Sequence, residues 1–60
     1  MAKTIVQTIL DIDNKVQQLN TDEKEFIKET LLFHESEPMA AAEKISEYLG
    51  VNYSSIFDLL

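Results

Sequence analysis

The chain has 60 residues, of which 45% are hydrophobic, and 11 acidic residues against five basic ones give it a net charge of −6. This length allows one domain at most, and the apolar content is too high for a disordered tail. The chain contains no cysteine, which excludes disulfides and thiolate metal sites. Its acidic excess opposes binding to phosphate backbones and to anionic membrane surfaces.

The small size of the chain predicts association. A domain of this length buries only about 60% of the surface of its unfolded chain, so a lone monomer is marginally stable. Natural proteins of this size commonly add disulfides, a metal or a partner subunit. Because cysteine is absent, we expect a homodimer joined through an apolar face.

The N-terminal segment does not resemble a targeting sequence. Its short apolar stretch is interrupted by Gln7, Thr8 and Asp11, whereas a signal peptide needs an unbroken apolar region. No run approaches the roughly 20 apolar residues of a membrane span. We therefore expect a soluble, cytoplasmic protein that does not bind membranes.

A first helix is predicted from Lys3 to Leu19. Apolar residues recur there at alternating spacings of three and four, as in a heptad pattern: Ala2, Ile5, Ile9, Ile12, Val16 and Leu19. Asp11 and Lys15 have the favourable spacing for an ion pair on the outer side of the helix. The apolar side packs either against the rest of the same chain or against a second copy.

A second helix is predicted from Asp22 to His34. Asn20 and Glu23 have the spacing of a capping box at its start. The run from Leu31 to Phe33 is too broad for one neighbouring helix to cover, and it predicts contact with another helix or another chain. Together with the heptad pattern, it gives the residues expected at an oligomer interface: Ile5, Ile9, Ile12, Val16, Leu31, Leu32 and Phe33.

Two further helices are predicted in the C-terminal third. Pro38 suits the first turn of a helix over Met39–Leu49. Gly50 can supply the left-handed backbone that ends it, and Asn52 is a suitable cap for a last helix over Tyr53–Leu60. The sequence therefore predicts an all-α fold of three to four short helices in a single domain, residues 1–60.

The segment Ala42–Leu60 resembles the helix-turn-helix of small bacterial and phage regulators. The shared pattern consists of inward-facing apolar residues, a glycine turn and a corner residue: Ile45, Leu49, Gly50, Val51, Ile56 and Leu59. The resemblance covers about a third of the chain and identifies no single family. It implies a DNA-binding regulator whose Asn52, Tyr53 and Ser54 would contact bases and phosphates.

The charge of this segment does not favour nucleic acid. No Lys or Arg follows Lys44, whereas Glu47 and Asp58 remain, and Ser46 stands where the pattern usually has alanine. About half to two-thirds of protein–DNA hydrogen bonds go to phosphate and sugar, and this segment supplies few donors for them. The same scaffold without basic residues suits docking to a protein.

Aromatic and acidic residues near the C-terminus suggest what such docking would use. Tyr53 and Phe57 are four residues apart and share one side of the last helix. Aromatic side chains are frequent anchors of protein interfaces. We therefore predict contact with a basic surface of another protein through Tyr53, Phe57, Asp58, Glu43 and Glu47. The alternative is that Phe57 and Tyr48 complete the core.

The sequence gives little support for catalysis. His34 is the single histidine, and a catalytic histidine needs a nucleophile and an orienting partner beside it. The run Asp11–Asn14 has the acidic spacing that begins a calcium loop but lacks its glycine and its final glutamate. We therefore expect a non-enzymatic protein without metal or cofactor. A protein-interaction module is favoured, with a DNA-binding regulator and a structural subunit of a homo-oligomer as alternatives.

Overall fold

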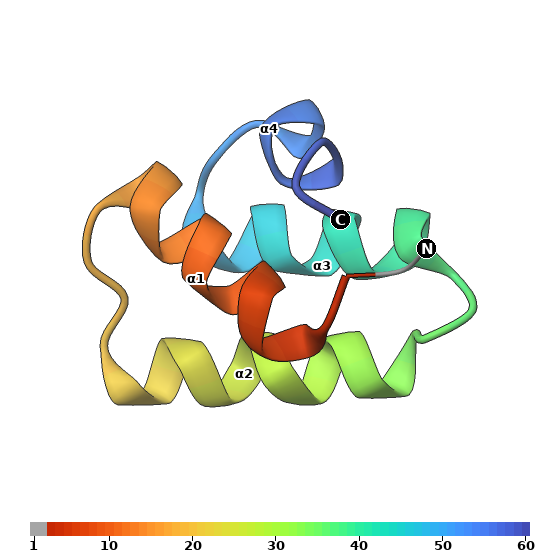
Figure 1. The fold of residues 1–60 in the computed structure, drawn as a ribbon. Helices are drawn as coiled ribbons and strands as arrows, with labels where there is room; N and C mark the ends of the chain where they lie inside the picture. The colour runs from red at the N-terminus through yellow and green to blue at the C-terminus, as the bar shows by residue number, and fades with distance from the viewer. Residues whose placement is uncertain (1–2) are drawn as a thin grey trace.

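A computed structural model describes residues 3–60, which form four helices and no strand (Figure 1). The helices are α1 (Ile5–Val16), α2 (Thr21–Phe33), α3 (Pro38–Leu49) and α4 (Tyr53–Phe57). The predicted all-α fold is confirmed. Ala2, which begins the predicted heptad pattern, lies outside the described residues.

The helices enclose one core. Figure 1 shows α2 and α4 on opposite sides of α3, with α1 in front of α2 and α3. Each helix contributes one fully buried isoleucine: Ile12, Ile27, Ile45 and Ile56. Leu19 and Ala42 complete the buried cluster.

The structure contradicts the prediction that Ile12 lies at an oligomer interface. Its side chain is completely enclosed by its own chain, so it offers no surface to a second copy. Ile5, Ile9 and Val16 are half-buried on the same side of α1, and the last two pack against the core. The heptad pattern in α1 thus marks the side that packs within the chain.

The predicted end of the first helix at Leu19 is wrong. The helix stops at Val16 because Gln17 and Gln18 both have positive φ, at 58° and 101°. The Leu19 amide donates instead to the Asp13 carboxylate at 2.8 Å. This turn directs Leu19 into the core, where it is 7% exposed.

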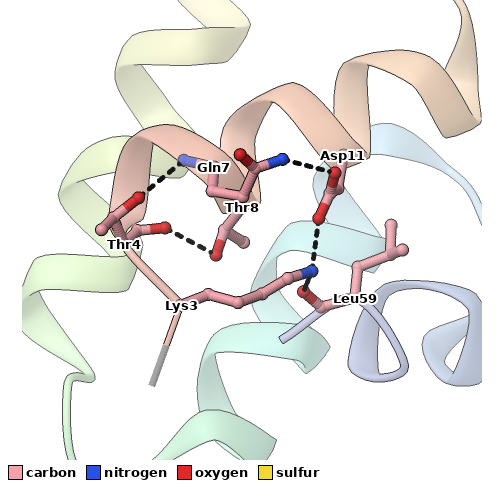
Figure 2. Close-up of polar contacts among 6 residues, drawn as sticks. All are labelled: Lys3, Thr4, Gln7, Thr8, Asp11 and Leu59. Carbon is pink, nitrogen blue, oxygen red and sulfur yellow. Dashed lines mark hydrogen bonds and ion pairs between the residues drawn. The ribbon is translucent and has the colours of Figure 1, made fainter. Parts of the chain in front are cut away.

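The start of α1 is fixed by polar contacts (Figure 2). The Thr4 hydroxyl accepts from the Gln7 amide at 3.1 Å, which satisfies one of the free backbone donors at a helix start. The predicted Asp11–Lys15 ion pair is replaced, because Lys3 approaches Asp11 from the chain's N-terminal segment. The Lys3 ammonium also donates to the Leu59 carbonyl at 2.6 Å, which ties α1 to the C-terminal segment.

The capping box at the start of α2 is confirmed. The Asn20 side chain accepts from the Glu23 amide at 2.8 Å, and the Glu23 carboxylate accepts from the Asn20 amide at 2.9 Å. Both bonds supply partners for backbone donors that the helix itself cannot satisfy. The helix ends one residue before the predicted His34.

The turns around α3 follow the sequence, but α4 is shorter than predicted. Pro38 occupies the first turn of α3, and Gly50 ends it with φ 70°. Asn52 is at the cap position of α4, although its side chain makes no capping bond. The predicted extension of α4 to Leu60 is wrong, because the last amides form tighter turns, including Leu60 to the Phe57 carbonyl at 3.1 Å.

Candidate protein-interaction surface

Two aromatic side chains of α4 remain outside the core. Tyr53 and Phe57 lie one helical turn apart, and their rings stack with centroids 5.7 Å apart at an angle of 13°. Each residue is 39% exposed, whereas Ile56 between them is fully buried. The alternative that Phe57 completes the core is therefore not what the structure shows.

The aromatic pair of α4 lies on a different side of the helix from Ser55. Ser55 lines a shallow depression together with Lys15 of α1, so this side of α4 faces α1. Residues two positions apart lie about 200° apart around a helix, which places Tyr53 and Phe57 on the other side. The pair thus lies on a different side of α4 from Ser55, and each of its residues is partly exposed.

The uncovered side of α3 is acidic. Its buried residues lie on one side: Ala41, Ala42, Ile45 and Ser46. Glu43 and Glu47 are exposed, one turn apart, and Asp58 beyond α4 is also exposed. Within residues 3–60, Lys3 pairs with Asp11 and His34 lies beside Glu37, so these three carboxylates have no cationic partner in that part of the chain.

All five residues predicted to contact a partner are therefore at the surface of the α3–α4 pair. We call this set the aromatic–acidic surface: Tyr53, Phe57, Asp58, Glu43 and Glu47. Its exposed aromatic rings are a property typical of protein interfaces. Like charges one turn apart, as in Glu43 and Glu47, destabilise a helix mildly unless a cation approaches them.

A second aromatic pair joins α2 to α3. The rings of Phe26 and Tyr48 stack with centroids 4.0 Å apart at an angle of 20°. An open depression beside them is lined by both rings and by Lys44 and Glu47. Tyr48 is 48% exposed, so it does not complete the core as the alternative expected. The sequence did not reveal its contact with Phe26, because the two residues are remote in the chain.

The α3–α4 arrangement has the order of elements of a helix-turn-helix, with Gly50 at the turn. The helix that would enter a DNA groove is α4, and it has five residues, which is about 7.5 Å at 1.5 Å per residue. Lys15 of α1 is near Asn52 and Ser55. The exposed residues of α3 and α4 include two acidic and three aromatic ones: Glu43, Glu47, Tyr48, Tyr53 and Phe57.

His34 lies at the end of α2, with Nδ1 3.6 Å from the Glu37 carboxylate. Its ring meets that of Phe33 edge to face. No group of three metal-ligating side chains occurs among residues 3–60. Within the same residues, no helix has the length and apolar character to span a membrane.

The residues predicted for an oligomer interface differ in their exposure. Leu31 is half-buried against the core, whereas Leu32 and Phe33 are exposed. Two residues of α1 that were not in the predicted set are also exposed: Val6 at 68% and Leu10 at 50%. They are four residues apart and so share one side of the helix.

No protein-family model matches the chain, and comparisons with curated proteins and with solved structures find no match.

Proposed function

We propose that the protein is a small, non-catalytic interaction module whose aromatic–acidic surface binds a basic surface of another protein, in a regulatory role. The observation that carries this proposal is the stacked Tyr53–Phe57 pair. Both residues are 39% exposed, and the carboxylates of the aromatic–acidic surface have no cationic partner among residues 3–60. In a chain with so small a core, leaving two large rings half-exposed forgoes stabilisation that burial would provide.

The charges of this surface indicate which partner it suits. Glu43, Glu47 and Asp58 have no cationic partner among residues 3–60, and the whole chain carries −6. Such a field attracts basic surfaces and repels phosphate backbones. A basic protein partner therefore fits the electrostatics better than duplex DNA does.

A structural role in a homo-oligomer is a second candidate. Val6 and Leu10 form an exposed apolar strip on α1, and neither belongs to the core cluster. A second copy covering this strip would add buried apolar area to a chain whose four largest fully buried side chains are isoleucines. This role is compatible with partner binding at the aromatic–acidic surface, because the two surfaces lie on different helices.

In-cell photocrosslinking tests the proposed function. A photoreactive phenylalanine analogue at position 57 should form a covalent adduct with a basic protein in the native cell. The same analogue at position 32, on the exposed side of α2, is the matched control and should not capture that protein.

The captured protein should then bind the purified chain, and Phe57→Ala or Asp58→Lys should weaken that binding by about fivefold or more. Duplex DNA should not bind at an ionic strength of about 0.15 M. Saturable DNA binding there would instead support the DNA-binding alternative. Equal capture from positions 57 and 32 would contradict the proposed surface.

A further inference from the structure

We propose that the groove between α2 and α3 is a second docking site, which receives an apolar side chain of a basic partner segment. The α2–α3 groove consists of two adjoining depressions, both lined by Phe26 and Lys44. Phe33 and Glu29 line the first, and Tyr48 and Glu47 line the second. This inference rests on the proposed function for the basic character of the partner.

Phe33 is the exposed ring of the groove. Its side chain is on the α3-facing part of α2, where it shares a depression with Phe26 and Thr30, and the residue is 83% exposed. The His34 ring meets it edge to face with centroids 4.9 Å apart, a favoured aromatic geometry. The His34 ring contacts the Phe33 ring, but most of Phe33 is exposed. The Phe33 ring therefore has apolar area available for a partner side chain.

The floor of the groove is also aromatic. The stacked rings of Phe26 and Tyr48 bridge α2 and α3, so the groove is built on two elements that pack within the same core. Neither element needs to move for a side chain to lie against the rings. This arrangement limits the conformational entropy lost on binding, which is one of the main costs of association.

The acidic residues of the groove favour a partner segment with positive charge. Glu29 and Glu47 are exposed at the two depressions, and within residues 3–60 neither has an ion-pair partner. Lys44 supplies one positive charge against these two carboxylates. A segment with lysine or arginine beside an apolar side chain would therefore be attracted to the groove.

One partner segment could contact both sites. Glu47 lines the groove and, with Glu43, also belongs to the aromatic–acidic surface. The protein measures 26 × 20 × 18 Å along its principal axes, and a helix of about 14 residues is about 21 Å long. A single basic amphipathic helix therefore has the length to cross the uncovered side of α3.

A synthetic amphipathic helix of about 14 residues, made of leucine and lysine, tests this inference by fluorescence anisotropy with the full chain. Phe33→Ala should weaken its binding by about fivefold or more. Leu32→Ala is the matched control, because Leu32 is exposed on the same helix outside the groove, and it should leave the affinity unchanged. Lys44→Gln should strengthen binding, since it removes the positive charge of a residue that lines both depressions.

The variants separate this inference from the proposed function. If Phe57→Ala weakens binding and Phe33→Ala does not, the groove is not a docking site and the proposed surface stands. If Phe33→Ala alone weakens binding, the groove stands and the aromatic–acidic surface is contradicted. Absence of binding, or equal binding of an analogue with glutamate in place of lysine, overturns both. Circular dichroism of each variant confirms that it is folded.

Discussion

Left-handed backbone conformations at two residues decide where α1 and α3 end. Gly50 has φ 70°, and an added Cβ would meet no atom within 4 Å. Gln17 has φ 58° at the end of α1, a region that costs a residue with a side chain roughly 1–2 kcal/mol. The glycine at position 50 predicts the turn after α3, whereas nothing in the sequence predicts the turn at Gln17.

Substitutions at these two residues should change stability in opposite directions. Gly50→Ala should lower the free energy of unfolding by about 1 kcal/mol, because only the backbone conformation opposes it. Gln17→Gly should raise it by about 0.5 kcal/mol, since relief of strain exceeds the added entropy of the unfolded chain. Urea denaturation measures both; a loss of stability in Gln17→Gly would contradict the assigned end of α1.

Asp11 gives stability a pH dependence. The hydrogen bond from Lys3, then that from Gln7, lowers the pKa of the Asp11 carboxyl below its ordinary value of 3.8. Because the folded pKa is lower than the unfolded one, the stabilisation is complete above the unfolded pKa and is lost as pH falls through the folded pKa. The stability difference between wild type and Asp11→Asn should therefore disappear at acidic pH.

Lysine variants identify the partner of Asp11. Lys3→Met should remove this part of the pH dependence, because Lys3 holds the carboxylate (Figure 2). Lys15→Met, which deletes the partner expected from the spacing, should leave it unchanged. Loss of the pH dependence in Lys15→Met but not in Lys3→Met would instead support the Asp11–Lys15 pair predicted from the sequence. The sequence could not show the observed pair, because Lys3 reaches Asp11 from outside the helix.

In α4, a buried and an exposed apolar residue are neighbours. Ile56 is fully buried, while Phe57 next to it is half-exposed. Ile56→Ala should reduce the free energy of unfolding by about 2–5 kcal/mol. Phe57→Ala should cost less than half as much despite removing a larger side chain. Equal losses in urea denaturation would mean that Phe57 belongs to the core.

The sequence predicted the helices better than their ends or their contacts. Apolar spacing and the capping residues Asn20, Pro38 and Gly50 were sufficient for four elements, because these signals act within a few residues. The end of α1 depends on the Asp13–Leu19 bond. The Phe26–Tyr48 stack depends on how α2 and α3 pack. Both are consequences of the folded chain, so local patterns do not reveal them.

Because the whole molecule has only 60 residues, we expect it to associate with a second copy. The exposed strip of Val6 and Leu10 is the surface we expect a second copy to cover. The midpoint of thermal unfolding should then rise with protein concentration, because dimerisation stabilises the folded state by mass action. Leu10→Lys should abolish this rise and give a monomer by light scattering. A monomer at every concentration of the wild type would contradict this interface.

From charge and shape together we propose that the exposed side of α3 and α4 binds a basic protein segment. Amide chemical-shift mapping with the leucine–lysine helix tests this claim. We predict that the largest shifts lie in residues 43–48 and 53–58 and weaken as salt rises. Shifts centred on α1, or shifts at 53–58 produced by duplex DNA and not by the peptide, would contradict the claim.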